Sequence, residues 1–166
     1  MKTTLKISTL ALIAVLMSCG GGEEKKKTGF SYETNSTTET NTSAEAKDIP
    51  ASKTIDLTNK GIGPITSLNL DTNIDANLAK QGEELFTKTC TACHRPDKKF
   101  IGPAPKDILN RRTPEWVMNL ILNPNNMVKD DPLAKALLEE HNGSPMPVQI
   151  TSEDEARALL EYFRTL

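Results

Sequence analysis

The sequence predicts an all-α domain of four to five helices in the C-terminal part of the chain. Apolar residues between Thr72 and Leu166 recur at helical spacing, and almost no stretch shows the alternation of a half-buried strand. Capping residues and prolines stand where such helices would begin and end. This segment has 95 residues, and aromatic residues make up only 4% of the chain, so its side chains alone would form a small core.

The first helix is expected to begin after Asn73 or Asp75, because both residue types are common N-caps. It would end at Cys90. The residues at i, i+4, i+7 and i+8 share one helix face, which is the face expected to be buried. They are Leu78, Gly82, Leu85 and Phe86.

The second helix is expected to begin at Thr113-Pro114, where a capping residue precedes a proline at the first helical position. Asn123-Pro124 would end it, because the residue before a proline disfavours helical dihedrals. Between these limits, four residues recur at helical spacing. They are Trp116, Val117, Leu120 and Ile121.

Asp131-Pro132 repeats this start signal for a third helix, and Gly143 is placed to close it. Its buried stripe would consist of Leu133, Ala134, Leu137 and Leu138.

The last helix is expected to open at Thr151, with Asp154 three residues later in a near capping box. Its inner face would consist of Ala156, Leu159, Leu160 and Phe163.

The N-terminus has the pattern of a secretory signal. Lys2 and Lys6 precede an apolar run over residues 7–17, which is too short to span a membrane. We expect residues 1–18 to be removed. The run ends in Ser18-Cys19, which resembles the bacterial lipoprotein signal, in which the cysteine becomes lipidated; an ordinary signal with a stray cysteine is the alternative. The first interpretation predicts an exported lipoprotein, anchored at Cys19 to the membrane on its periplasmic side.

Two segments separate this anchor from the helical domain. Residues 20–48 consist mainly of Gly, Glu, Lys, Ser, Thr and Asn, so they cannot bury enough apolar surface to fold, and we expect a disordered tether over residues 19–48. Residues 49–71 are more apolar and rich in turn residues. They form either an arm packed on the domain or further linker, and the helical domain spans residues 72–166.

The stretch Cys90-Thr91-Ala92-Cys93-His94 is a C-x-x-C-H motif, which in an exported protein is an attachment site for c-type haem. Two thiols at i and i+3 share a helix face, and an imidazole is a good ligand for iron. A zinc site would need two more ligands, for which only His141 and Cys19 are spare. A thioredoxin-like pair would need a βαβ pattern in a cytosolic protein.

Residues 75–166 resemble the class I cytochromes c, which carry a single haem. Gly82 and Phe86 match the family's glycine and aromatic residue in the first helix, and the haem motif matches Cys90, Cys93 and His94. The resemblance implies a fold of helices around one covalently attached haem c, with the last helix crossing at Gly82, opposite Leu159 and Tyr162. Ile101-Gly102-Pro103 is similar to the family's Gly-Pro turn, which implies that Pro103 packs on the haem and accepts a hydrogen bond from His94.

The second axial ligand is expected to be Met146. It lies in Ser144-Pro145-Met146-Pro147, a loop before the last helix that resembles the Met-Pro pair of class I cytochromes. Met127, expected on a loop, is a rival, whereas Met118 lies within a helix and fits a core position. His141 is a further rival, although a histidine near a helix C-terminus can simply complement the helix dipole.

A haem iron with six ligands has no open position, so the sequence predicts an electron carrier of a respiratory chain and no catalytic residue. The alternatives are a peroxidase-like haem enzyme, and a sensor or fixed subunit of a redox complex. The resemblance suggests redox proteins as donor and acceptor, such as a quinol-oxidising complex and a terminal oxidase or nitrous oxide reductase.

Charge is distributed unevenly along the domain. Residues 80–112 contain eight basic and four acidic residues, whereas residues 113–166 contain four basic and nine acidic residues. This asymmetry either orients the haem-motif side toward an acidic partner or reflects two solvated faces. Electron transfer that does not slow as salt is raised would exclude steering. The chain's net charge of −2 argues against nucleic acid as a partner.

Overall fold

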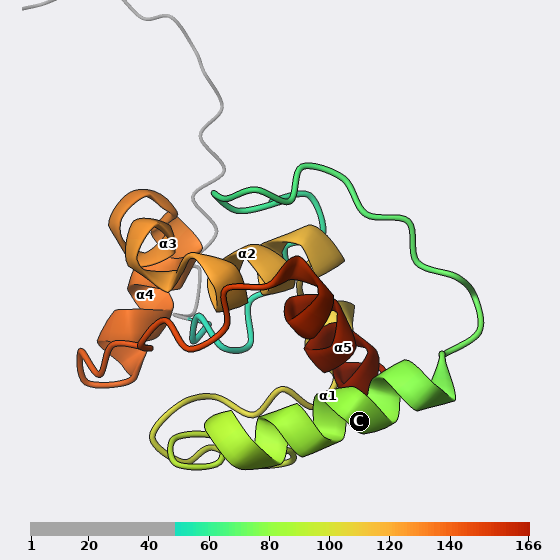
Figure 1. The fold of residues 1–166 in the computed structure, drawn as a ribbon. Helices are drawn as coiled ribbons and strands as arrows, with labels where there is room; N and C mark the ends of the chain where they lie inside the picture. The colour runs from blue at the N-terminus through green and yellow to red at the C-terminus, as the bar shows by residue number, and fades with distance from the viewer. Residues whose placement is uncertain (1–48) are drawn as a thin grey trace, which may run out of the picture. The chain divides into compact units, whose positions relative to one another are not determined.

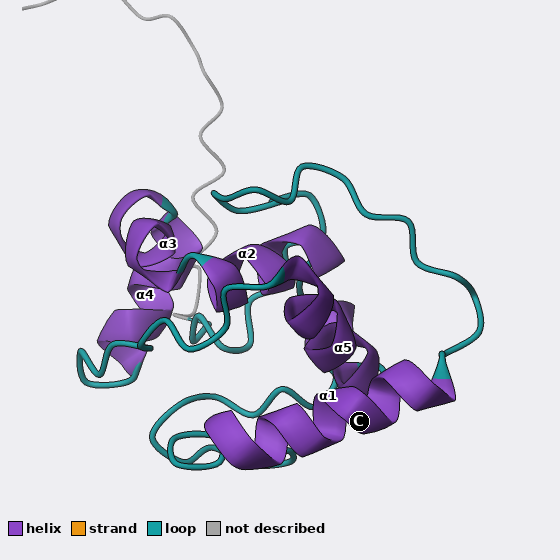
Figure 2. Ribbon diagram, viewed as in Figure 1, coloured by secondary structure: helices purple, strands orange, loops and turns teal. Residues whose placement is uncertain are grey.

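The computed structural model describes residues 49–166, so the predicted signal peptide, Cys19 and the tether lie outside the described residues. The described part contains five α-helices, one short 3-10 helix and no strand, which confirms the all-α prediction (Figures 1 and 2). None of the helices in residues 49–166 has the length and apolar character needed to span a membrane. The elements are α1 (Ala76–Thr89), η1 (Ile108–Asn110), α2 (Pro114–Leu122), α3 (Pro124–Asp130), α4 (Pro132–Glu140) and α5 (Glu153–Phe163).

Helices α1 and α5 cross at close range, and Gly82 makes the crossing possible (Figure 1). A Cβ atom at Gly82 would overlap the backbone carbonyl of Ala158 and would lie 2.9 Å from Cβ of Tyr162. Next to this point, the rings of Phe86 and Tyr162 pack with their centroids 5.5 Å apart, in a tilted arrangement. The crossing therefore has the form that the sequence predicted, with a missing side chain on α1 facing the backbone of α5.

Local capping interactions fix most helix starts where the sequence predicted them. The carboxylate of Asp75 accepts hydrogen bonds from two backbone N–H groups of α1, and the side chains of Thr113 and Asp131 cap α2 and α4. The start of α5 was predicted one residue too early. Ser152, rather than Thr151, is the N-cap, and its hydroxyl accepts from the N–H of Glu155 at 3.5 Å.

Helix α3 was not predicted, and placing Met127 on a loop was wrong. Pro124 ends α2, but it also occupies the first turn of a new seven-residue helix, because a proline there needs no N–H partner. Met127 lies in that helix with an exposed fraction of 0%. The sequence signal for a helix end was thus also the signal for the next helix start.

Residues 49–71 pack on the helical domain, and we call this segment the arm. The arm runs along α2, and its Ile65 belongs to the hydrophobic core (Figure 1). The buried guanidinium of Arg112 donates to the backbone carbonyls of Ala51 and Thr54. At the far end of the arm, Arg164 of the C-terminal segment donates to the carbonyl of Asp71 at 2.6 Å.

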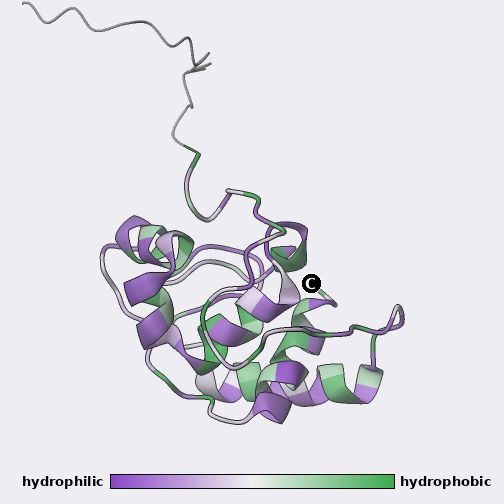
Figure 3. Cartoon of the chain, turned by 90° about the horizontal axis from the view of Figure 1, so that it is seen from above, coloured by the Kyte–Doolittle hydropathy of each residue, from purple (hydrophilic) through white to green (hydrophobic). Residues whose placement is uncertain are grey.

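Apolar residues occupy one side of the helices and polar residues the other (Figure 3). The core contains the predicted aliphatic residues of α5, including Leu159 and Leu160, with exposed fractions of 1% and 0%. In contrast, the predicted stripe of α4 is only partly buried apart from Ala134, and two of its leucines, Leu137 and Leu138, line a cavity. This cavity is the candidate functional site.

Candidate cofactor pocket

A cavity lies between the helices of the domain, and its walls come from all five α-helices together with two loops. The first loop follows the C-x-x-C-H motif and the second precedes α5. Most of the lining is aliphatic, aromatic or proline, which is the surface that a large apolar cofactor requires. The helical part of the lining includes Phe86, Val117, Leu120, Ile121, Leu137 and Leu159.

The end of α1 brings both motif cysteines to this cavity. Cys90 is the C-cap, and its carbonyl accepts from the N–H groups of Cys93 at 3.1 Å and His94 at 2.9 Å, so the motif continues the helical turn. Both thiols are half-buried and free of disulfide bonds. Burial raises the pKa of the Cys90 thiol, and the hydroxyl of Thr89, 3.3 Å away, opposes this rise. The unmodified side chain is therefore a neutral thiol at neutral pH.

His94 is held by the loop that contains Gly102 and Pro103. Its Nδ1 lies 2.8 Å from the carbonyl oxygen of Pro103, and because a carbonyl only accepts, Nδ1 carries the proton. The lone pair of Nε2 is then available to a metal. A Cβ atom at Gly102 would overlap the His94 ring, so a glycine lets the loop pack directly on the imidazole. This contact and the hydrogen bond together fix the tautomer and the orientation of the ring.

The structure separates the three methionines of the described chain. Met146 is half-buried in the cavity wall. Met118 is 2% exposed and belongs to the core without lining the cavity. Met127 is completely buried on the side of α2 that faces the arm, where its Sδ accepts from the N–H of Ile62 at 3.0 Å. The two rivals therefore have packing roles, and Met146 is the methionine placed at the pocket.

His141 also lines the cavity, at the end of α4, with an exposed fraction of 4%. Its Nδ1 lies 3.0 Å from the carbonyl oxygen of Ile101, whereas its Nε2 is buried and has no hydrogen-bond partner. Burial lowers the pKa of His141, and the nearby charge of Lys99 lowers it further. Ile101 is next to Gly102, so His141 is attached to the same loop that supports His94, which disfavours it as a ligand on the opposite side of an iron.

The residues present fit a covalently bound haem c. Two thiols and an oriented imidazole stand at one wall, and apolar side chains form most of the remainder. Within residues 49–166, His, Cys, Asp and Glu side chains form no group of three that could hold a metal ion by themselves.

The sequence did not reveal the full role of two residues. From the sequence, His141 was predicted only as a lesser ligand candidate. The structure shows that its ring is buried against Ile101, 40 residues away in the chain, and that its Nε2 has no hydrogen-bond partner. The sequence did not single out Asn119, a residue of α2 that is 1% exposed and bonds the arm. A polar residue within the apolar pattern of α2 was the signal that could have indicated a buried partner.

Comparison with known proteins agrees with this geometry. The family model Cytochrome c matches residues 79–166. Cytochrome c-551 from Pseudomonas denitrificans is 34% identical over 86 residues, which cover 51% of this chain and 96% of that protein. The solved structure of cytochrome c from Rhodothermus marinus covers 70% of this chain and 92% of its own, at 46% identity and a TM-score of 0.60. An engineered form of the Rhodothermus protein, bound to a carbene intermediate, matches at 45% identity and a TM-score of 0.58, covering 70% of this chain and 93% of its own.

Proposed function

As the chain belongs to the cytochrome c family, we propose that it is a membrane-tethered electron carrier whose haem iron is bound by His94 and Met146. Membership of the family implies one covalent haem c and a function as electron carrier. When bound, the haem supplies one iron that gains and loses a single electron. The motif assigns the two thioether links to Cys90 and Cys93.

The observation that carries the ligand assignment is that His94 and Met146 line the same cavity, whereas Met118 and Met127 do not. Pro103 and Gly102 hold the imidazole of His94 in one orientation, so this ligand need not move when the charge of the site changes. A thioether as the second ligand favours a higher reduction potential than a second imidazole would. The apolar walls exclude water, which limits the reorganisation that accompanies electron transfer.

Spectra of two methionine variants test this assignment. In Met146→Ala we expect loss of the near-infrared charge-transfer band of ferric Met ligation, together with a large fall in the reduction potential. Met127→Ala removes a methionine from the core, so it should lower stability by about 2–5 kcal/mol while leaving the band in place. A band that survives in Met146→Ala, or a wild-type ferric protein with a high-spin haem, would contradict the proposal.

The proposed tether depends on Cys19, which precedes the described residues. An exported protein with two haem cysteines has one cysteine left, and its position after an apolar run supports lipidation. The mature protein should therefore sediment with membranes on the periplasmic side and carry acyl chains on residue 19 by mass spectrometry. In Cys19→Ser we expect an unprocessed or soluble product. A wild-type protein found free in the periplasm without lipid would refute the tether.

We further propose that the partners are redox proteins of a respiratory chain, with a quinol-oxidising complex as donor and a terminal oxidase or nitrous oxide reductase as acceptor. The basic surface after the haem motif supports an acidic partner: Arg95 stacks over the exposed ring of Phe100 at 4.1 Å, and Lys98 and Lys99 are exposed beside it. Reduction by membranes that contain the donor should slow as ionic strength rises. Reduction that is independent of salt would exclude this docking mode.

A further inference from the structure

The arm carries aliphatic side chains that do not take part in its packing on the helical domain. Four of the eight large hydrophobic side chains that are exposed in residues 49–166 lie in this segment of 23 residues. They are Ile49, Ile55, Leu57 and Ile62. Three of the others, Phe100, Ile101 and Val148, lie in the two loops that border the cavity, where an apolar surface accords with the proposed function. The exposed residues of the arm have no such explanation.

The backbone holds Ile55 and Leu57 on the same outward side of the arm. Asp56, between them, forms an isolated parallel β-bridge with Arg112, and its N–H donates to the carbonyl of Arg111 at 2.9 Å. Successive side chains of an extended segment point to opposite sides. Asp56 is accordingly half-buried, whereas its two neighbours have exposed fractions of 67% and 55%. A fixed backbone therefore presents two aliphatic side chains to the surroundings.

The position of this pair along the chain indicates what covers it. Ile49 is 66% exposed and stands where the proposed tether joins the arm, just before a turn in which the N–H groups of Lys53 and Thr54 donate to the carbonyl of Pro50. Between Cys19 and residue 49 there are 29 residues, and a chain of that length spans at most about 100 Å. A lipid anchor at residue 19 would hold the arm near the membrane at an effective concentration on the order of 1 mM, so a weak affinity is sufficient.

The charges beside these side chains also fit a lipid surface. Lys53, two residues before Ile55, is exposed and lines a surface hollow between the arm and the loop after the haem motif. Five basic residues line this hollow against three acidic ones. One of the acidic residues, Glu140, already binds Ser52. A bilayer with anionic phospholipids offers an apolar boundary to the aliphatic side chains and phosphate groups to the lysine.

We propose that Ile49, Ile55 and Leu57, which we call the aliphatic patch, rest on the surface of the anionic membrane that carries the lipid anchor. The inference deepens the proposed function and rests on its anchor at Cys19. Lys53 shares its hollow with Lys98 and Lys99 of the proposed docking surface. Contact of the patch with lipid therefore keeps that surface beside the membrane, where a membrane-embedded donor is within reach.

The test is hydroxyl-radical labelling of side chains, read by mass spectrometry. The lipidated full-length holoprotein on vesicles of phosphatidylethanolamine and phosphatidylglycerol is compared with the same holoprotein made without acyl chains, in solution. We expect labelling of Ile55 and Leu57 to fall by about two- to tenfold on the vesicles, because a millimolar effective concentration keeps a weakly binding patch on lipid for half to nine-tenths of the time. Ile74, which is 41% exposed and lies beyond the other end of the arm, is the internal control and should be labelled equally in both samples.

Two variants separate the apolar and the charged contributions. Ile55→Asn should restore most of the labelling of Leu57 on vesicles, because half of the outward pair is lost. Lys53→Glu should do the same, because its carboxylate is repelled by phosphatidylglycerol. Ile74→Asn is the matched control and should leave Leu57 protected. All three positions are exposed, so each variant should keep the fold and the haem spectrum of the wild-type protein.

The outcomes distinguish this inference from the proposals on which it rests. Acyl chains on residue 19 together with equal labelling of Ile55 and Leu57 in both samples would overturn the inference and leave the anchor in place. Protection that appears in solution and grows with protein concentration would assign the patch to a second copy of the chain. Protection on native membranes but not on protein-free vesicles would assign it to a protein partner. Either result overturns the inference, and a wild-type protein without acyl chains would overturn both the tether and the inference.

Discussion

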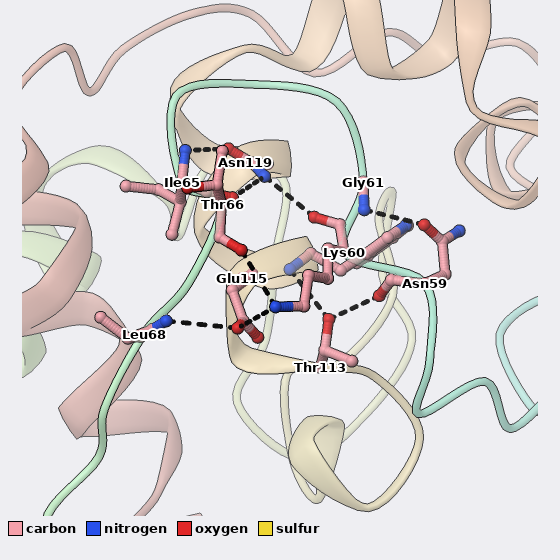
Figure 4. A network of polar contacts seen from close by, with 10 residues as sticks. Asn59, Lys60, Gly61, Ile65, Thr66, Leu68, Thr113, Glu115 and Asn119 are labelled. Carbon is pink, nitrogen blue, oxygen red and sulfur yellow. Dashed lines mark hydrogen bonds and ion pairs between the residues drawn. The ribbon is translucent and has the colours of Figure 1, made fainter.

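Replacing Asn119 by alanine tests how much one buried amide of α2 contributes to holding the arm on the helical domain. Nδ2 of Asn119 donates to the carbonyls of Lys60 and Ile65, each at 2.9 Å, and Oδ1 accepts from the N–H of Ile65 at 3.0 Å (Figure 4). The arm approaches so closely that a Cβ atom at Gly63 would overlap this amide oxygen. Asn119 is 1% exposed, so water cannot replace these bonds while the arm stays in place.

The three hydrogen bonds of Asn119 determine the expected change in the free energy of unfolding. At about 1 kcal/mol net for each bond, Asn119→Ala should lower the free energy of unfolding by about 3 kcal/mol. Two unpaired backbone groups of Ile65, which is 8% exposed, would add about 1–3 kcal/mol each if the arm stayed in place. The arm can instead loosen and hydrate them, so the smaller figure is expected. For a domain of this size it corresponds to a fall in Tm of roughly 10–20 °C.

The assay is urea unfolding of the ferric holoprotein, followed by circular dichroism and haem absorption. The substitution is made in the full chain and in a chain whose mature part begins at residue 72. That shorter domain is similar in extent to the Pseudomonas cytochrome c-551, of which 96% aligns with 51% of this chain. Without the arm, Asn119→Ala should cost under about 1 kcal/mol, because its partners are gone.

Asn125→Ala, at an exposed position in α3, serves as the control and should change stability by less than about 0.5 kcal/mol. An equal loss for Asn119→Ala in both backgrounds would refute the reasoning, because the amide would then act within the helical domain and not on the arm.

Two further substitutions test the helix crossing and the start of the arm. Gly82→Ala places a Cβ atom against the backbone carbonyl of Ala158, which cannot rotate away, so the free energy of unfolding in urea should fall by about 1–3 kcal/mol. Lys80→Ala, on the exposed face of α1, is the control and should be nearly neutral. A Gly82→Ala protein as stable as that control would contradict the close approach of the two helices. The hydroxyl and N–H of Ser52 bond the carboxylate of Glu140 at 2.5 and 2.7 Å, and although burial opposes ionisation, these bonds hold the pKa of Glu140 below its usual 4.5. The stability that these bonds contribute is fully present above about pH 4.5, and it is lost as the pH falls through the lowered pKa of Glu140 in the folded protein. Ser52→Ala should therefore lower the free energy of unfolding by about 1 kcal/mol at pH 7 and by less near pH 3. An equal cost at both pH values would argue against this link between ionisation and stability.

The sequence alone was sufficient for features that depend on neighbouring residues. Asp75, Thr113 and Asp131 cap helices through N–H groups two or three residues away, so their spacing is visible in the chain. The haem motif is equally local, because Cys90, Cys93 and His94 lie within five consecutive residues. Signals of this kind failed where one residue serves two purposes, as Pro124 does in ending α2 and beginning α3.

Only the tertiary structure decided which side chains meet across the fold. Met127 and Met146 each follow a proline within three residues, yet Met127 contacts the arm and Met146 lines the cavity. The bond between Asn119 and Ile65 joins residues 54 positions apart, and that between His141 and Ile101 joins residues 40 apart. Backbone propensities act over three or four residues, whereas these contacts depend on how whole helices pack, and no local pattern encodes that packing.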